Sequence, residues 1–378
     1  MARVAILHNT LDGRGGADAV CLHVCEALQS AHDVTLFTLS RSSLSELNAL
    51  FATDADVRVH RPPGTGAVCR AFDALPDRFG PQLAARSVLL RRLFTPHADD
   101  FDAAVSTANE FDLPLPSLQY VHFPQFNRRH ADAAADGTPR LDALWSRLAG
   151  VGDRRLPVDA RLHANSAWTA DVVATIYGRR PRVLAPPVDT VPNPQPWDDR
   201  EAGVVSLGRL APDKRPLRAI RIVDGVRARG YDLHLHLVGS SSSSYADYAR
   251  RVAAAAADRP YVHLERDVPR ERVEELLATH RYGLNCKPAE HFGMAVAEYV
   301  AAGMVAFAPD AGGQREVLAG RPDRLYTSTA DAVATVAAAV DGADRPTLPR
   351  DRYASGRFHA AIRTRLAELL RAESESAR

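Results

Sequence analysis

The feature that most constrains the fold is an alternation of short β-type runs with longer helix-type runs along most of the chain. Parallel strands need a crossover connection of about a dozen residues or more, usually a helix, so this alternation is typical of parallel sheets covered by helices. One segment, Pro186–Trp197, contains five prolines in twelve residues and can continue neither a strand nor a helix. The sequence therefore predicts two doubly wound α/β domains joined by a stiff linker.

The spacing of apolar residues and the turn and capping residues place the individual elements. In the first domain, strands are expected at Val4–Asn9, Val34–Leu39, Val57–His60, Ala103–Thr107, Leu118–His122, Arg161–Asn165 and Arg182–Pro186. Its helices are expected at Gly16–Ser30, Ser42–Phe51, Pro81–Phe94, Leu141–Gly150 and Trp168–Gly178. In the second domain, strands are expected at Gly203–Leu207, His234–Val238, Tyr261–Glu265, Tyr282–Cys286 and Val305–Ala308. Its helices are expected at Pro216–Arg229, Tyr245–Ala257, Glu271–His280, Met294–Ala302 and Gln314–Leu318. A final helix, Phe358–Ala372, fits against either domain.

Charge and cysteine content exclude several classes of protein. The chain of 378 residues has 47 basic and 46 acidic side chains, so it lacks the one-sign surface with which proteins bind nucleic acids. Any anion must therefore be bound locally. The four cysteines form no C-x-x-C pair, which argues against a disulfide framework or a structural metal. The apolar run Val4–Leu7 is too short for a signal peptide, so a cytoplasmic protein without a membrane span is expected.

The strongest local pattern runs from Pro288 to Gly303, where a strand end, a loop with Glu290, Gly293 and a helix with Glu298 follow one another. Eight residues of helical rise separate the two carboxylates by about 12 Å, more than the roughly 5–9.5 Å between paired glycosidase carboxylates. The spacing suits the two ends of one long ligand, with a helix N-terminus between them for an anion. On spacing alone, a helix cap at Glu290 and a solvated Glu298 fit equally well.

A second pattern, Gly208–Pro216, follows the predicted strand Gly203–Leu207 and places Arg209 and Lys214 in a βα loop. A guanidinium binds two oxygens at once and an ammonium is a point charge, so the two suit a diphosphate, although a plain polar loop is the alternative. Only two of the basic residues are lysines, Lys214 and Lys287, and the second lies three residues before Glu290. The serine run Ser240–Ser244 is expected to be a flexible loop in preference to a phosphate cradle.

These residues resemble the retaining glycosyltransferases of family 4, which have the two-domain GT-B fold. The family's E-x7-E motif matches Glu290 and Glu298, its Gly-Arg-Leu…Lys motif matches Arg209 and Lys214, and its glycine pair matches Gly312-Gly313. The amino-acid sequences of these motifs are similar to those of one branch of the family, the α-1,2-mannosyltransferases that extend lipid-linked oligosaccharides on the cytosolic membrane face. The segments similar to that branch are Tyr120–Pro124, Asn165–Thr169, Pro186–Asp189 and Glu290–Tyr299. The resemblance covers about residues 5–320.

The resemblance implies a role for each matching residue on the donor side. It implies that Glu298 binds the ribose of the donor and that Arg209 and Lys214 bind its diphosphate. Glu290 is implied to bind the transferred sugar. The backbone of His291, Phe292, Gly293 and Met294 is implied in binding the same sugar.

On the other domain, the resemblance implies that His122 reaches the donor sugar across a cleft. Gly15 and Gly16 match the glycine loop where acceptor and donor phosphates meet, while Asp18 stands where the branch usually has glutamate. The implied division is an acceptor-binding Rossmann-like domain at residues 1–190, a nucleotide-sugar domain at 198–355 and a C-terminal helix at 356–378.

The chemistry that this resemblance implies is a retaining transfer of a hexose, with mannose from GDP-mannose favoured, to a glycan or polyprenyl-linked glycan. No carboxylate nucleophile is evident near His122, so we expect a front-face mechanism in which the leaving diphosphate helps to deprotonate the acceptor hydroxyl. Arg209, Lys214 and helix dipoles would stabilise the developing charge. Such a mechanism needs no metal or further cofactor, and we recognise no carboxylate or histidine ligand cluster in the sequence.

Several alternatives stay open from the sequence. A nucleotide-sugar epimerase of the same fold, or a non-catalytic subunit that binds a nucleotide sugar, would share these motifs. A dehydrogenase is disfavoured because the first glycine loop lacks the third glycine of the dinucleotide fingerprint, and a pyridoxal-phosphate phosphorylase because few lysines can form a Schiff base. The arginine-rich segment Leu83–Phe94 predicts either a helix that contacts a membrane surface or one that packs on the core.

Overall fold

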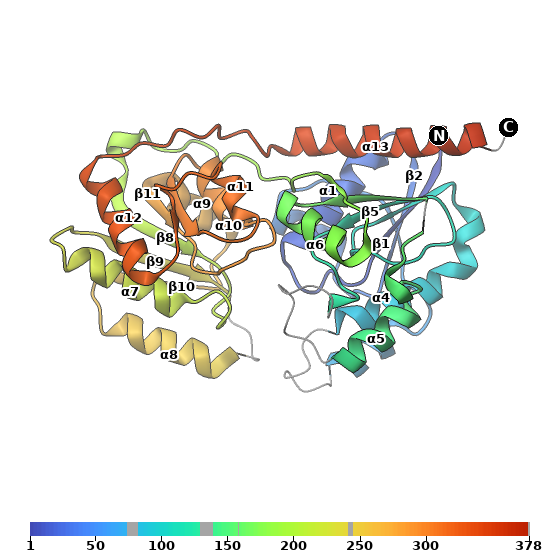
Figure 1. Cartoon of the computed structure of the whole chain (residues 1–378), viewed down its shortest axis with the longest axis horizontal. Helices are drawn as coiled ribbons and strands as arrows, with labels where there is room; N and C mark the ends of the chain where they lie inside the picture. Colours follow the sequence, from blue (N-terminus) through green and yellow to red (C-terminus); the bar gives the residue numbers. More distant parts are fainter. Residues whose placement is uncertain (74–81, 129–138, 158, 241–244, 377–378) are drawn as a thin grey trace. The chain divides into compact units, whose positions relative to one another are not determined.

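The computed structural model describes residues 1–73, 82–128, 139–157, 159–240 and 245–376. The chain forms two compact units (Figure 1). The first consists of Met1–Pro187 together with Ser355–Arg378, and the second of Val188–Ala354. Part of the proline-rich segment belongs to the second unit, because Val188 donates a backbone hydrogen bond to Tyr353 O and Gln195 donates one to Ala278 O. That segment therefore packs on the second unit from Val188 onward.

The first unit is a parallel sheet covered by helices. In its described residues the strands are β1 (Arg3–His8), β2 (Asp33–Thr38), β3 (Arg58–His60), β4 (Ala103–Ser106), β5 (Ser117–Val121), β6 (Ala160–Ala164) and β7 (Arg182–Val183). The helices are α1 (Gly16–Gln29), α2 (Leu44–Phe51), α3 (Thr65–Asp73), α4 (Leu83–Phe94), α5 (Pro139–Leu148), α6 (Ala167–Tyr177) and α13 (Ser355–Ser376). The strand order β3-β2-β1-β4-β5-β6-β7 begins as in a Rossmann sheet. All strands are parallel, and the order in which the chain adds strands to the sheet reverses between β1 and β4.

Each strand of this sheet contributes to two apolar layers, because successive side chains point to opposite faces. In β1, Val4 and Ile6 lie in one core and Ala5 and Leu7 in the other. The C-terminal helix α13 completes the first of these cores through Phe358, Ile362, Leu366 and Leu369, whose spacing places them on one helix face. Figure 1 shows α13 beside α1. The final helix therefore packs on the first unit. The sequence had left open which of the two domains it packs against.

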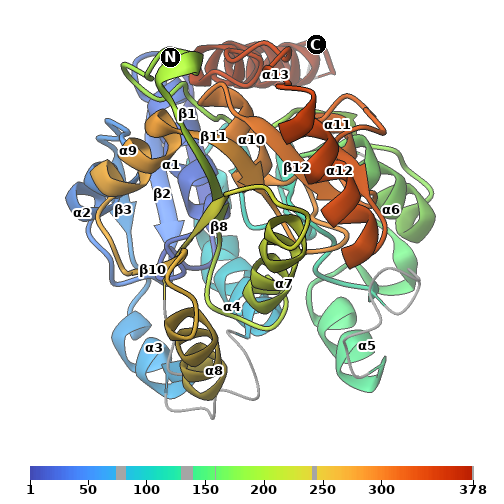
Figure 2. The same ribbon diagram turned by 90° about the vertical axis from the view of Figure 1, so that its left-hand side faces the viewer.

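The second unit repeats the same plan. Its strands are β8 (Glu201–Leu207), β9 (His234–Gly239), β10 (Val262–Arg266), β11 (His280–Leu284), β12 (Val305–Pro309) and β13 (Leu325–Tyr326). Its helices are α7 (Pro216–Arg227), α8 (Ala246–Ala257), α9 (Arg270–Thr279), α10 (Met294–Ala301), α11 (Gln314–Val317) and α12 (Thr329–Asp341). All pairs are parallel, in the order β10-β9-β8-β11-β12-β13, so the reversal falls between β8 and β11. Figure 2 shows α7 beside α12 on this sheet.

Most predicted elements exist within a few residues of the expected bounds. Among the described residues, the α-helices and strands that were missed are α3, β13 and α12. Ser328 caps α12 by accepting a hydrogen bond from the Asp331 N–H, a serine-to-aspartate spacing that is visible in the sequence. The segment Pro81–Phe94 is helical over Leu83–Phe94. Ser241–Ser244 of the serine run lie outside the described residues.

Helix α4 packs against the core. Val88, Leu90 and Phe94 are buried in one of the first unit's apolar layers, and Arg86 is itself buried. Arg91 donates to Asp112, with 2.8 Å between Nη2 and the carboxylate. Of the two readings left open for this segment, the structure therefore supports packing on the core. Among the described residues, no helix combines the length and the apolar character that crossing a membrane requires.

Candidate functional site

The candidate site of the second unit lies where the strand order reverses. In doubly wound sheets, ligands bind outside the carboxyl ends of the strands at this point, because the two neighbouring βα loops diverge there. In this unit the two strands are β8, followed by the loop with Arg209 and Lys214, and β11, followed by the loop with Lys287 and Glu290. The fold thus brings together two sequence patterns that are about 75 residues apart.

A network of alternating charges joins these two loops. The Lys214 ammonium donates to Glu290 Oε1 at 2.5 Å, and the Lys287 Nζ lies 3.6 Å from Glu290 Oε2. Lys287 also lies 3.5 Å from Asp213, which in turn lies 3.6 Å from Arg209. The only two lysines of the chain therefore meet at one carboxylate.

Glu290 is held in its ionised form. Burial alone would raise the pKa of Glu290, but the nearby charges of Lys214 and Lys287 outweigh it and lower that pKa. Arg209 lies at the outer end of the network with a side chain that is 54% exposed, so its guanidinium is available to a ligand. The network combines three cations, Arg209, Lys214 and Lys287, with two carboxylates, Asp213 and the partly buried Glu290. This arrangement suits a ligand with both anionic and hydroxyl groups.

Glycines allow the loop that follows β8 to approach the end of β9 closely. A Cβ on Gly239, at the end of β9, would lie 1.8 Å from the carbonyl oxygen of Gly208. Gly208 itself has φ +156°, and a Cβ added there would lie 3.4 Å from the aliphatic stem of Lys214. Backbone hydrogen bonds from Gly208 to Val238 and from Leu210 to Ser240 fix the loop at this position. The conformation that presents Lys214 thus depends on two residues without side chains.

The Gly312-Gly313 pair serves the Glu290 loop in the same way. A Cβ on Gly312 would lie 2.4 Å from Glu290 O, and one on Gly313 would lie 2.3 Å from His291 O. The Gly313 N–H donates to Glu290 O at 2.8 Å. Sequence reasoning missed Gln314, which is fully buried and donates to the carbonyls of Lys287, Pro309 and Ala311. A polar residue directly after a glycine pair was the available signal.

Helix α10 starts beside Glu290, with Gly293 at its N-cap position (φ +104°). Because α10 starts at Met294, Glu290 lies in a loop, and the estimate of eight residues of helical rise to Glu298 is wrong. The first amides of α10 have no partner inside the helix, as at any helix N-terminus. Phe292 is buried and packs edge-on against Tyr353.

The rest of α10 is fixed by two contacts. Tyr299 is fully buried, and its hydroxyl accepts the Leu207 N–H at 2.6 Å, which ties the helix to the end of β8. Gly283 on β11 leaves room for the Tyr299 ring, since an added Cβ would lie 2.2 Å from it. Glu298 accepts a hydrogen bond from Arg270 at 2.7 Å, so its carboxylate is oriented before any ligand binds. Tyr299 and Arg270 were not singled out by the sequence.

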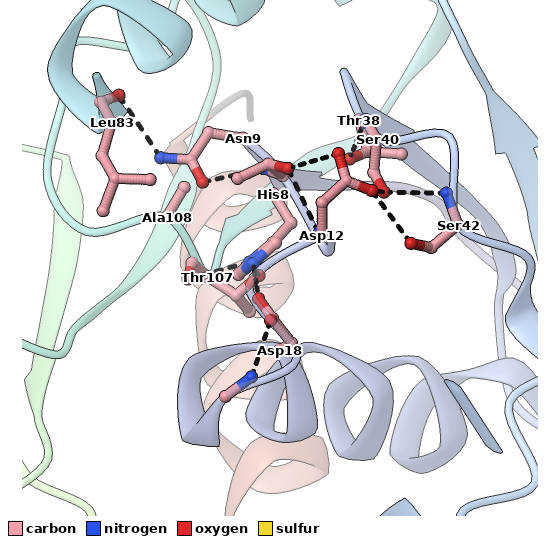
Figure 3. A network of polar contacts seen from close by, with 12 residues as sticks. His8, Asn9, Asp12, Asp18, Thr38, Ser40, Ser42, Leu83, Thr107 and Ala108 are labelled. Atoms are coloured by element: carbon pink, nitrogen blue, oxygen red, sulfur yellow. Dashed lines mark hydrogen bonds and ion pairs between the residues drawn. The ribbon is translucent and has the colours of Figure 1, made fainter. Parts of the chain in front are cut away.

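In the first unit, the reversal between β1 and β4 carries a buried polar network (Figure 3). His8 Nδ1 lies 3.1 Å from the Thr107 carbonyl, and His8 Nε2 lies 3.0 Å from Asp18 Oδ1. The Thr107 hydroxyl also lies 2.9 Å from Nδ1, so a positively charged ring would find an acceptor at each nitrogen. Burial opposes this charge, but the neighbouring Cys21 and Asp18 raise the pKa of His8 to about 10.

Asp18 also shapes the glycine loop at the start of α1. It accepts the Gly15 N–H at 2.9 Å, while Gly15 and Gly16 themselves are exposed. Asp12, before the loop, accepts hydrogen bonds from Thr10, Ser40 and Ser42 (Figure 3). The loop is therefore held from both sides by carboxylates.

His122 directly follows β5, at the same carboxyl edge of the first sheet. Its N–H donates to Asn109 Oδ1 at 2.7 Å, and its carbonyl accepts from Asn165 Nδ2 at 2.8 Å. The half-buried ring packs edge-on against Tyr120. The two asparagines follow β4 and β6 and fix the backbone that carries the ring.

The structure also differs from the expectation that there is no histidine ligand cluster. His234, His236 and His280 of the second unit lie close enough to share a metal ion, although no histidine ligand cluster was recognised in the sequence. His234 and His280 are far apart in the chain, so only the strand pairing reveals the cluster. It lies at the amino ends of the strands, whereas the charge network lies at their carboxyl ends.

Part of the sequence is similar to known proteins. Residues 188–340 match the family described as glycosyl transferases group 1. Over 157 residues the chain is 29% identical to the GDP-Man:Man(3)GlcNAc(2)-PP-Dol alpha-1,2-mannosyltransferase of Eremothecium gossypii, covering 38% of this chain and 27% of that protein. The protein of the same name from Candida glabrata is 28% identical over 220 residues, covering 50% and 42%. The matched region thus spans less than half of either relative.

Solved structures show the fold. The chain is similar to Anabaena Alr3699/HepE in complex with UDP and glucose, with a TM-score of 0.69 at 15% identity and coverage of 97% and 100% of the two chains. It is similar to sucrose-phosphate synthase of Thermosynechococcus elongatus (TM-score 0.68, 13% identity, all of both chains). It is also similar to WaaG, a glycosyltransferase involved in lipopolysaccharide biosynthesis (0.64, 14%, 98% and 95%). The predicted GT-B fold, with two Rossmann-like domains, is therefore confirmed.

Proposed function

We propose that this chain, whose residues 188–340 form a glycosyl transferases group 1 domain, is a retaining glycosyltransferase. Its donor would be a nucleotide diphosphate sugar and its acceptor a hydroxyl of a glycan or lipid-linked glycan. The observation that carries the proposal is the contact between Lys214 and Glu290 at the reversal point of the second sheet. A cation for a diphosphate, a carboxylate for sugar hydroxyls and a helix N-terminus lie there side by side.

In the proposed reaction, Arg209 and Lys214 neutralise the diphosphate, and Glu290 accepts hydrogen bonds from the sugar. The bond between the anomeric carbon and the diphosphate oxygen breaks, and the acceptor oxygen forms its bond to that carbon on the same face. The acceptor's proton passes to the departing phosphate oxygen. Cations and the start of α10 stabilise the negative charge that grows on this oxygen. No step of this scheme requires a metal or another cofactor.

The remaining residues have proposed supporting roles. Glu298, oriented by Arg270, would accept the two ribose hydroxyls of the donor. In the first unit, His122 would contact the donor sugar, and Gly15 and Gly16 would leave space for phosphate groups near the acceptor. Asn109 and Asn165 hold the His122 backbone in place for this role.

The finer identity of the substrates rests on the two fungal relatives, whose names specify GDP-mannose and a dolichyl diphosphate glycan. We extend this to mannose as the transferred sugar, GDP-mannose as the donor and a polyprenyl-linked glycan as the acceptor. A lipid-linked acceptor would bring the chain to a membrane surface, on the cytoplasmic side that we expect from the sequence.

Incubation of the protein with labelled GDP-, UDP- and ADP-sugars and a polyprenyl diphosphate glycan tests the proposal. We expect label in the glycan, with the anomeric configuration of the donor retained. Label in an epimerised nucleotide sugar would instead identify an epimerase, and tight binding without conversion a non-catalytic subunit. Absence of binding to every nucleotide sugar would contradict all three.

A further inference from the structure

A cluster of histidines occupies the amino edge of the second sheet. The pairing register sets Gly203 of β8 opposite His234 of β9, and Glu201 of β8 opposite His280 of β11. Gly203 makes the meeting of the two rings possible, because a Cβ there would lie 2.2 Å from His234 Nε2 and 2.5 Å from His280 Cδ2. The strand pairing thus places the two imidazoles on either side of a residue that has no side chain.

The spacing of the ligand atoms fits a tetrahedral metal ion. His234 Nε2 and His280 Nε2 lie 3.0 Å apart, and Glu201 Oε2 lies 3.5 Å and 4.0 Å from them. One nitrogen each of His234, His236 and His280 lies within 4.8 Å of the others. With zinc–ligand bonds of about 2.0–2.2 Å, the edges of a tetrahedral site measure about 3.3–3.6 Å. The separations of 3.0–4.0 Å among His234, His280 and Glu201 bracket this value, and the His236 nitrogen lies within 4.8 Å of those of His234 and His280.

The outer hydrogen bonds of two of these rings leave their Nε2 atoms ready to bind a cation. His280 Nδ1 lies 2.9 Å from the Leu276 carbonyl, and His236 Nδ1 lies 3.1 Å from Glu265. His280 Nδ1 also lies 2.9 Å from Thr279 Oγ1. The carbonyl and the carboxylate favour the tautomer with the proton on Nδ1, which leaves a lone pair on each Nε2. A carbonyl or a carboxylate behind each imidazole is the usual second layer of a histidine metal site.

We propose that His234, His236 and His280 bind one Zn²⁺ ion, with Glu201 as the fourth ligand. Imidazole nitrogens with one carboxylate oxygen are a ligand set that zinc accepts. The site links the amino ends of β8, β9 and β11, whereas Lys214 and Glu290 lie beyond the carboxyl ends of the same sheet. The ion is therefore structural, and it stabilises the unit that carries the charge network without entering its chemistry. This proposal is independent of the proposed function.

Zinc binding by the full-length protein tests this inference. After removal of metals with EDTA, we titrate with Zn²⁺ and measure the stoichiometry by calorimetry and the bound metal after desalting. We expect one tightly bound ion per chain and a melting temperature that rises with zinc concentration. The variants His234→Gln and His280→Gln should bind zinc at least tenfold more weakly. Glu201→Gln should weaken binding as well, and it should stay folded because the Glu201 side chain is 59% exposed.

Two matched controls separate this site from other histidines. His263→Gln changes an exposed ring that stacks on His236 but is no proposed ligand, and it should bind zinc as the wild type does. His359→Gln disrupts a second group, His23, Glu26 and His359 of the first unit, and should likewise leave the tight site intact. The proposal is wrong if the wild type binds no stoichiometric zinc, or if His359→Gln abolishes binding while His234→Gln and His280→Gln do not.

Discussion

The pairing of Lys214 with Glu290 leads to a quantitative prediction about stability. The two groups are 2.5 Å apart, and their side chains are only 23% and 14% exposed. A hydrogen bond to a charged partner contributes about 1.5–3 kcal/mol net, so we expect a coupling energy of about 2 kcal/mol for this partly buried pair. A double-mutant cycle of Lys214→Met and Glu290→Gln isolates this energy.

The network also predicts the order of the single variants. Glu290→Gln should cost the most, about 3 kcal/mol, because it leaves two ammonium groups without their shared carboxylate. Lys287→Met should cost less than about 1 kcal/mol, since its ion pairs are longer than hydrogen bonds. Urea unfolding measures these energies. In a background with the first unit's tryptophans replaced by phenylalanine (Trp145→Phe and Trp168→Phe), fluorescence reports on Trp197 of the second unit alone.

A matched control is Arg250→Met, which removes a surface pair with Asp247 whose side chains are 76% and 88% exposed. It should cost less than about 0.5 kcal/mol. A coupling energy near zero for Lys214 and Glu290, or a cost of Lys287→Met equal to that of Lys214→Met, would refute the reasoning.

Three further predictions concern the same structure. Gly239→Ala should displace the loop with Arg209 and weaken nucleotide binding at least tenfold, because its Cβ would lie 1.8 Å from Gly208 O; Gly356→Ala, in open space, should have no effect in the same titration. The difference in unfolding free energy between wild type and Glu290→Gln should be complete at pH 7 and shrink below about pH 4.5, because a lowered pKa stabilises the fold only while Glu290 is ionised. Urea unfolding as a function of pH measures this difference. A difference that stays constant with pH would contradict the pairing of Glu290 with the lysines. Arg91→Ser should lower the free energy of unfolding by about 1 kcal/mol because it removes the hydrogen bond to Asp112. Arg92→Ser should leave both stability and liposome flotation unchanged. A loss of flotation in this variant would show that α4 contacts membranes.

Much of the fold could be predicted from the sequence, because strands buried on both faces are continuous apolar runs and parallel strands need helical crossovers. Val4–Asn9 and β1, or Pro216–Arg229 and α7, differ by only a few residues. The missed helix α12 consists mainly of alanine and valine, whose pattern has little amphipathic contrast. The missed strand β13 has only two residues, too few for any period.

The site was predictable only in part. Arg209, Lys214 and Glu290 could be proposed from the sequence because each follows a strand within a short motif. That the ammonium of Lys214 contacts Glu290 depends on β8 lying beside β11, a tertiary pairing that local spacing does not encode. The same holds for the buried amide of Gln314 and for the histidine cluster, which joins His234 and His280 through the same strand pairing.

The central claim is that Lys214 binds the diphosphate of a nucleotide donor. Isothermal titration with GDP, UDP and ADP, comparing the wild type with Lys214→Met and with the control Arg250→Met, tests it most directly. For the preferred nucleotide we predict that Lys214→Met binds about 10- to 100-fold more weakly, the equivalent of one charge-assisted hydrogen bond, while Arg250→Met binds as the wild type does. Equal affinity of Lys214→Met and wild type, or no binding of any of the three nucleotides, would contradict the claim.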